Sequence, residues 1–103
     1  MQKTNFSIGQ IIRHKLFNYR GIIVDVDFQF SGTDEWYENV AHSRPSKKQP
    51  WYTILVDNAN HQTYVAEQNL NTSSSHQTIN NPLMEHYFTK IGESSYTPKI
   101  VKN

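Results

Sequence analysis

Apolar and polar residues alternate along residues 22–30, and this alternation predicts a β-strand. One face of the strand carries only apolar side chains, namely Ile22, Val24, Val26, Phe28 and Phe30. The opposite face carries Asp25, Asp27 and Gln29, and only Ile23 breaks the pattern. A period of two with one apolar face is typical of an antiparallel strand that is buried on one side.

Two further runs, Trp51–Val56 and Gln62–Glu67, are rich in aromatic and β-branched residues and enclose the polar turn Asp57–Asn60. This arrangement predicts a β-hairpin. Because neighbouring side chains on a strand face opposite sides, we expect at most one of Trp51 and Tyr52 to lie deep in the core.

The remaining segments of the core region predict additional short strands. Residues 6–14 read as a turn that leads into a strand, with Gly9 where the backbone needs freedom or close approach. Residues 16–21 read as a reversal with Asn18 and Gly21 as bend residues. Residues 68–70 read as a short strand or a 3₁₀ turn. Four or five hairpin-connected strands in so short a chain must curl to hide their edges, so we predict a mostly-β fold, a small SH3-like barrel of about five strongly bent antiparallel strands.

Two polar stretches and a helix complete the predicted domain, which spans residues 1–103 with a barrel core at about 6–70. The long loop at 31–49 has room for one or two helical turns at 34–40, and long loops often carry function. It is equally well explained as a tolerated insertion. A polar connector at 71–80 leads to a short helix at about 82–91, which begins at Asn81-Pro82. The tail at 94–103 reads as frayed.

Composition narrows the class of protein. The 103 residues are 36% hydrophobic and 13% aromatic, and no cysteine is present, which excludes disulfides and thiolate metal sites. No continuous apolar stretch suggests a signal peptide or a membrane span, so we expect a cytoplasmic protein with no membrane partner. The net charge of +1 is too small to indicate nucleic-acid binding by itself.

No arrangement of residues predicts catalysis. The five histidines, at positions 14, 42, 61, 76 and 86, lack the spacing of metal ligands. The carboxylates Asp25 and Asp27, and those at 34, 35 and 38, fit solvated surfaces better than an acid–base pair, which needs an apolar pocket. We therefore predict no enzyme, no catalytic residue, no metal site and no cofactor.

Aromatic and basic residues supply the candidates for binding. The candidate partner-binding residues are Trp36, Tyr37, Trp51 and Tyr52. Trp36 either folds back against one end of the barrel or belongs to a contact surface. The candidate nucleic-acid-binding residues are Arg13, Lys15, Arg20, Arg44, Lys47 and Lys48, although ordinary solubilising charge explains them equally well.

Three colinear segments carry a resemblance to a known family. These segments are FSIGQIIRHKLFNYRGIIVDVDFQF, PWYTILVDN and TYVAEQNL, and together they span roughly residues 6–70. The most specific elements are Pro-Trp-Tyr at 50–52 and the Tyr-x-Ala-Glu-x-x-Leu close at 64–70, which occur together at hairpin spacing. On these motifs the chain resembles the heat-shock protein HspQ family, also called the hemimethylated-DNA-binding or YccV-like family.

The resemblance implies a bacterial cytosolic SH3-like barrel that often self-associates, so a homo-oligomer is expected. It also implies two roles: binding of hemimethylated DNA near replication origins, and heat-shock quality control through a Lon-type ATP-dependent protease and its substrates. The family offers no catalytic residues to carry over. Because the charge of this chain is small, we place a role in protein interaction above a role in DNA binding.

Overall fold

A computed structural model describes residues 3–41, 44–91 and 95–98, and its centre is a five-stranded antiparallel sheet. The strand order is β4-β3-β2-β1-β5, and each neighbouring pair is antiparallel. The predicted hairpin is confirmed, as is the count of about five strands. The strands are β1 (Ile11–His14), β2 (Arg20–Asp27), β3 (Trp51–Val56), β4 (Gln62–Ala66) and β5 (Leu70–Thr72).

The sheet bends strongly but stays open between its two end strands. Only the 3₁₀ turn η1 (Glu67–Asn69) separates β4 from β5, so the chain crosses from one edge of the sheet to the other within three residues. In the described part of the chain, β4 pairs only with β3 and β5 only with β1. The predicted SH3-like barrel is therefore barrel-like and incompletely closed. Both alternatives for residues 68–70, a 3₁₀ turn and a strand, occur in succession.

The concave face of the bent sheet encloses the first part of the core. Its buried side chains come from all five strands and from the segment before β1: Phe6, Ile12, Ile23, Tyr52, Ile54, Val65 and Leu70. All are at most 9% exposed. Burial of so many aliphatic and aromatic side chains is the main favourable contribution to the stability of the sheet.

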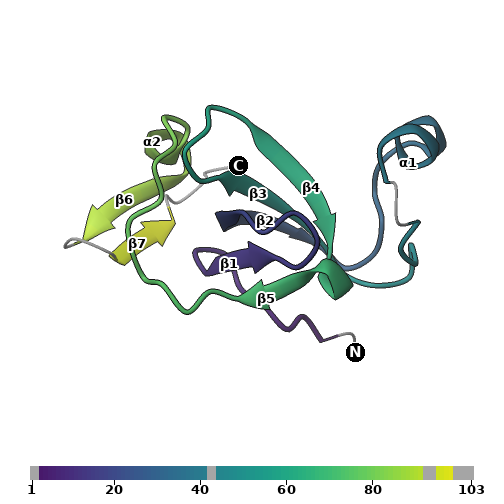
Figure 1. Cartoon of the computed structure of the whole chain (residues 1–103), viewed down its shortest axis with the longest axis horizontal. Helices are drawn as coiled ribbons and strands as arrows, with labels where there is room; N and C mark the ends of the chain where they lie inside the picture. Colours follow the sequence, from purple (N-terminus) through teal and green to yellow (C-terminus); the bar gives the residue numbers. More distant parts are fainter. Residues whose placement is uncertain (1–2, 42–43, 92–94, 99–103) are drawn as a thin grey trace.

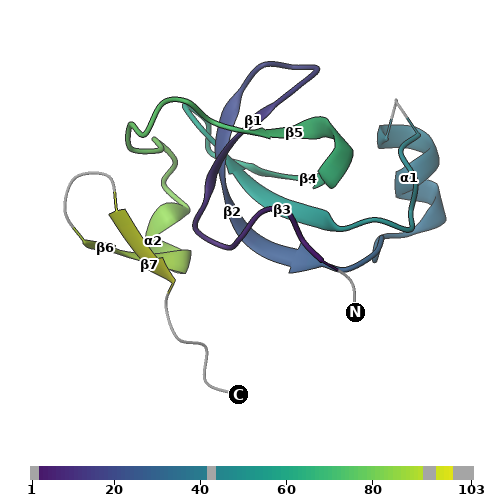
Figure 2. The same ribbon diagram turned by 90° about the horizontal axis from the view of Figure 1, so that it is seen from below.

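The opposite face is covered at both ends by segments from outside the sheet. At one end Ile79, Met84 and Phe88 pack on Ile22, Val24 and Leu55. At the other end α1 (Asp34–Val40) and its flanking residues bring Trp36 and Tyr37 against Trp51. Figures 1 and 2 show α1 and the C-terminal elements on opposite sides of the sheet.

Because both faces of the sheet are covered, two of our predictions are wrong. We expected a strand at 22–30 with one solvent-facing side, but residues 21–24 are all buried. We also expected at most one of Trp51 and Tyr52 in the core, but their exposed fractions are 1% and 0%. The two rings do face opposite sides of β3, and each side is covered.

A β-bulge in β2 explains why Ile23 broke the alternating pattern. Ile23 pairs with Ile54, whereas Asp25 pairs with the next residue along β3, Thr53, so one extra residue of β2 lies between them. The extra residue places Ile23 and Val26 on the same concave face. β2 ends at Asp27, and Phe28, which we placed on the apolar face, is 59% exposed.

The C-terminal segment differs from the helix predicted over 82–91. The helix α2 covers only Met84–Tyr87, and β6 (Phe88–Ile91) pairs with β7 (Ser95–Pro98). Burial of Phe88 on the sheet and pairing with β7 outweigh the helical spacing of the apolar residues. The predicted frayed tail is thus wrong for 95–98, and the rest of it lies outside the described residues. Of the helices described, none has the length and apolarity needed to cross a bilayer.

Candidate functional site

A groove with a volume of about 570 Å³ runs beside the edge strand β4. One wall is the turn between β1 and β2, and the other wall is α1 with the residues that follow it. Side chains from both faces of β4 line it, since Thr63 and Val65 point to one face and Tyr64 and Ala66 to the other. The groove therefore follows the open edge of the sheet.

The wall formed by the β1–β2 turn presents two exposed apolar side chains. Leu16 is 59% exposed and Phe17 is 66% exposed. The turn is ordered by His14, whose Nδ1 accepts hydrogen bonds from the backbone N–H groups of Leu16 and Phe17, both at 3.1 Å. Asn18 closes the turn with φ of 62°, as expected for a bend residue. Hydrogen bonds between the turn backbone and His14 thus keep these two apolar side chains at the surface.

His14 can act as an acceptor for this turn only in its neutral form. The residue is 4% exposed, and burial lowers the pKa of its imidazole below the ordinary value of 6.5. Its ring also lies between those of Phe17 and Tyr19, with centroid distances of 4.7 and 5.1 Å. Protonation would place a charge in this setting and remove both acceptor bonds.

A pH dependence of stability follows from the lowered pKa of His14. Because the unfolded chain binds more protons than the folded chain below pH 6.5, the free energy of unfolding should fall as the pH drops from 7.5 to 5. Urea unfolding at several pH values measures this slope. The variant His14→Gln should show a shallower slope than the parent. Equal slopes in the two proteins would contradict the assignment.

The second wall belongs to a set of five packed rings, which we call the aromatic cluster: Phe30, Trp36, Tyr37, Trp51 and Tyr64. The Oγ1 atom of Thr33 accepts the backbone N–H of Trp36 at 3.1 Å and so caps α1. The ring centroid of Trp36 lies 5.7 Å from that of Tyr64 and 6.2 Å from that of Trp51. Packing between these rings fixes α1 on the sheet.

The aromatic cluster also settles the position of Trp36. Trp36 folds back on the sheet, which was the first of the two alternatives considered from the sequence. Its side chain nevertheless stays half-buried and borders the groove. Val40, four residues later on the same helix face, borders the groove as well and is 48% exposed. Tyr37 packs inside the cluster and donates its hydroxyl to the carbonyl of Pro45 at 2.9 Å.

The other two candidate partner-binding residues lie beneath the surface. Trp51 contributes only a buried edge to the groove and donates its Nε1–H to the carbonyl of Ser46 at 3.2 Å. Tyr52 belongs to the concave core, and its hydroxyl donates to Oε1 of Glu67 at 2.7 Å. Burial, together with this carboxylate, raises the pKa of Tyr52. Neither side chain is available to a partner in this conformation.

Most of the candidate nucleic-acid-binding residues are bound to groups of the protein itself. Lys47 forms an ion pair with Asp34 at 2.8 Å, and its ammonium lies 4.5 Å from the ring centroid of Tyr37. Arg44 pairs with Glu38, and Arg13 binds the side-chain oxygen of Asn18. The hydrogen bond and charge of Lys47 lower the pKa of Asp34. Of the six, only Lys15 and Lys48 have no ion pair or side-chain hydrogen bond within the described ranges.

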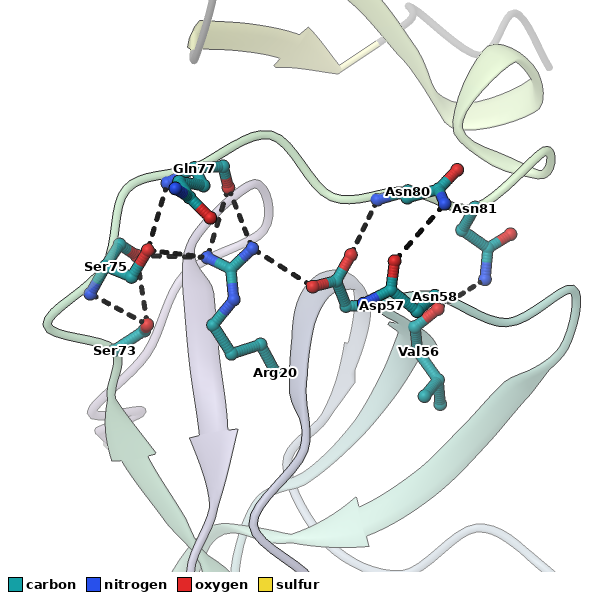
Figure 3. Close-up of polar contacts among 9 residues, drawn as sticks. All are labelled: Arg20, Val56, Asp57, Asn58, Ser73, Ser75, Gln77, Asn80 and Asn81. Carbon is teal, nitrogen blue, oxygen red and sulfur yellow. Dashed lines mark hydrogen bonds and ion pairs between the residues drawn. The ribbon is translucent and has the colours of Figure 1, made fainter.

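Arg20, the sixth candidate, holds the connector that follows β5 (Figure 3). Its guanidinium donates to the carbonyl oxygens of Ser75 and Gln77 at 3.2 and 3.1 Å, and it pairs with Oδ2 of Asp57 at 3.1 Å. The other oxygen of Asp57 accepts the backbone N–H of Asn80 at 2.7 Å. We call this set the connector clamp. It places Ile79 over the sheet and occupies Arg20 fully.

Asn81 completes the attachment of the connector. Its side-chain amide donates to the carbonyl oxygens of Val56 and His61 at 2.9 and 3.1 Å, as Figure 3 shows for Val56. Its Oδ1 accepts the backbone N–H of Leu83 at 2.9 Å, but the N-cap residue of α2 is Leu83, so the prediction that the helix begins at Asn81-Pro82 is wrong. The residue is 5% exposed, so these bonds satisfy a buried amide.

Acidic and histidine side chains do not assemble into a reactive centre in the described parts of the chain. Asp27, expected on a solvated face, accepts the hydroxyl of Tyr64 at 2.7 Å. Among the described residues, no three histidine, aspartate or glutamate side chains come together as metal ligands. His42 lies outside the described residues.

Sequence reasoning missed the residues that make the groove apolar, Leu16, Phe17 and Val40. The reversal at 16–21 contains the adjacent apolar residues Leu16 and Phe17, but their exposure depends on hydrogen bonds to the buried His14. Their relation to β4 depends on how the sheet bends, and this is visible only in three dimensions.

A comparison with protein-family models agrees with the fold and with the motifs. The model described as "hemimethylated DNA-binding protein YccV like" matches residues 4–95, which covers the whole sheet, both walls of the groove and the connector. That description names a binding domain and no reaction. With nine-tenths of its length matched, the chain belongs to the YccV-like family.

Proposed function

We propose that this protein is a cytoplasmic stress-response regulator without catalytic activity, which contacts other proteins and thereby modulates degradation by a Lon-type ATP-dependent protease. The observation that carries the proposal is the groove, where exposed Leu16 and Phe17 stand on an ordered turn. Apolar side chains grouped on a surface are typical of sites that bind proteins. Family membership supports a binding role, and self-association of the chain forms part of the proposal.

A reconstituted digest tests this role. We expect the parent protein to change the rate at which a Lon-type protease degrades an unfolded model substrate several-fold. The variant Phe17→Ser should lose most of this effect. Phe28→Ser is the matched control, because Phe28 is 59% exposed but does not line the groove. An unchanged rate at saturating parent protein would contradict the proposal.

Binding of hemimethylated DNA is the second candidate, and the description of the family favours it. In support, Lys15 and Lys48 have no ion-pair partner within the described ranges, so they are candidates for phosphate contacts. The pairing of Lys47, Arg44 and Arg20 within the protein leaves few such cations, which ranks this candidate second.

A gel-shift titration with unmethylated, hemimethylated and fully methylated duplexes separates specific from non-specific binding. The DNA role requires the tightest binding to the hemimethylated duplex, and a weaker affinity for Lys15→Gln. Equal affinity for all three duplexes, lost at moderate salt, would contradict it.

A further inference from the structure

We propose that the groove binds an extended, mainly apolar polypeptide segment of a partner protein, which adds to the sheet as a strand beside β4. This inference rests on the protein-binding role proposed above and specifies its partner: the segment has an exposed backbone and carries no cationic residue. Three features of the groove support it: the edge of β4, the apolar walls and the charge.

The edge of β4 offers backbone groups in a regular row. Two hydrogen bonds at the ends of the hairpin show which residues of β4 point their backbone groups toward β3. The Val56 N–H donates to the His61 carbonyl at 3.3 Å, and the Glu67 N–H donates to the Pro50 carbonyl at 2.9 Å. Residues 61, 63, 65 and 67 therefore face β3 with their backbone groups.

By the same alternation, Gln62, Tyr64 and Ala66 direct their backbone N–H and C=O groups away from β3, but Ala66 is only 1% exposed, so Gln62 and Tyr64 form the accessible part of this edge. Within the described ranges β4 pairs with no other strand. Successive outward groups are about 6.8 Å apart, the spacing of alternate residues in an antiparallel strand. An extended peptide presents its own backbone groups at that spacing, so it matches this edge.

The walls match the side chains of such a peptide. Phe17 is 66% exposed on one side, and Val40 is 48% exposed on the other. A bound strand directs alternate side chains to opposite faces, so valine or leucine at two consecutive positions would reach both walls. The bonds from His14 hold the turn in place before binding, which reduces the entropy lost on association.

The charges in and around the groove indicate which kind of polypeptide segment it can bind. Among the residues that the structure describes, none that lines the groove is an aspartate, glutamate, lysine or arginine. At its margin Arg44 is neutralised by Glu38, whereas Lys15, beside Leu16, has no ion pair within the described ranges. An apolar segment that ends in a carboxylate complements this distribution. A nucleic-acid backbone does not, since it needs several cations along its path.

Fluorescence anisotropy with a labelled synthetic peptide tests the inference directly. The probe is a ten-residue peptide of alternating Val-Val and Ser-Ser pairs that ends in aspartate, so valine side chains face both walls. Phe17→Ser and Val40→Ser should each raise its Kd, by about tenfold for Phe17, as expected when a large apolar contact is lost. The matched controls Phe28→Ser and Ile8→Ser alter residues that are 59% and 46% exposed and lie outside the groove, so they should leave the Kd unchanged.

Two further measurements identify the mode of binding. Hydrogen exchange at the amides of Gln62 and Tyr64 should slow when the peptide is bound. A version of the peptide with N-methylated backbone positions on one edge should bind far more weakly than the parent peptide. Both results are expected only if the peptide pairs with the edge of β4.

Several results would overturn the inference. These are the absence of peptide binding, equal weakening by the Phe17 and Phe28 variants, and protection of the Gln62 and Tyr64 amides by DNA in place of peptide. A fall in the mass of the assembly caused by Phe17→Ser would assign the groove to a second copy of this chain. Peptide binding without any effect on the protease digest would leave the inference standing and reject the proposed role in proteolysis.

Discussion

Replacement of Arg20 by methionine should destabilise the protein by about 2–3 kcal/mol, because it removes the cation at the centre of the connector clamp. The side chains of Arg20 and Asp57 are only 18% and 13% exposed, so the carboxylate would lose its charged partner in a largely desolvated place. The carbonyl oxygens of Ser75 and Gln77 would lose their donor as well. Urea unfolding of Arg20→Met and the parent measures the difference.

The same variant should loosen the cover of the sheet. The backbone N–H of Asn58 donates to the carbonyl of Asn80 at 2.8 Å, and this bond depends on the connector staying in place. Amide exchange at Asn58 should therefore be faster in Arg20→Met than in the parent. Arg13→Met is the matched control, because Arg13 is exposed and lies outside the clamp, and it should cost less than about 0.5 kcal/mol. A loss of the same size in both variants would contradict the role assigned to Arg20.

Replacement of Gly21 by alanine should cost about 3 kcal/mol, the upper end of the usual cost of forcing extra atoms into a packed core. Gly21 is buried in β2 opposite Val56, where a Cβ atom would lie 2.7 Å from the backbone carbonyl oxygen of Leu55 and would clash with Cγ2 of Ile54. A backbone atom in the middle of a sheet cannot move aside without disturbing the β2–β3 pairing. Thermal unfolding of Gly21→Ala should show a large fall in Tm.

Gly32→Ala is the control for this substitution. A Cβ atom at Gly32 would meet the ring of Phe30 and no backbone atom, so a side chain within the aromatic cluster must shift while the strand pairing stays intact. The expected cost is about 1–2 kcal/mol, less than for Gly21→Ala. If Gly21→Ala were no more destabilising than Gly32→Ala, the close approach of β2 and β3 at this point would be wrong.

Local patterns in the sequence predicted the strands well because each strand carries its own signal. The hairpin of β3 and β4 follows from aromatic and β-branched runs around a polar turn, and it formed with nearly the predicted bounds. Gly9 also has the backbone conformation expected, with φ of 90°. Gly21, by contrast, was expected to bend the chain. Position 21 requires glycine because β3 approaches β2 closely there, and no local pattern in the sequence reveals this contact.

Long-range packing explains the predictions that were wrong. A single sequence cannot show that α1 and the segment after the connector will cover the second face of β2 and β3, so Trp51 was not expected to be buried together with Tyr52. The helical spacing of Met84, Tyr87 and Phe88 was outweighed in the same way by pairing of Phe88–Ile91 with β7.

In the candidate site, too, local sequence signals identified some residues, whereas residues whose role depends on distant partners were missed. Trp36 was identified from its unusual place in a polar loop, and it does border the groove. Arg20 resembles any other exposed cation in the sequence, yet its partners lie 37 to 57 residues away. The groove residues of the β1–β2 turn were missed because their exposure depends on the support of a buried histidine.

The β-bulge between Ile23 and Asp25 makes the length of β2 critical, whereas the segment that follows β2 tolerates changes in length. Deletion of the extra residue would shift the register by one and send the side chains beyond it to the wrong face of the sheet. Length variation beside α1, in contrast, shifts no strand register and adds mainly closure entropy, about 0.6 kcal/mol for each doubling of loop length. Natural variants of this protein should therefore keep β2 at constant length and accept insertions and deletions beside α1.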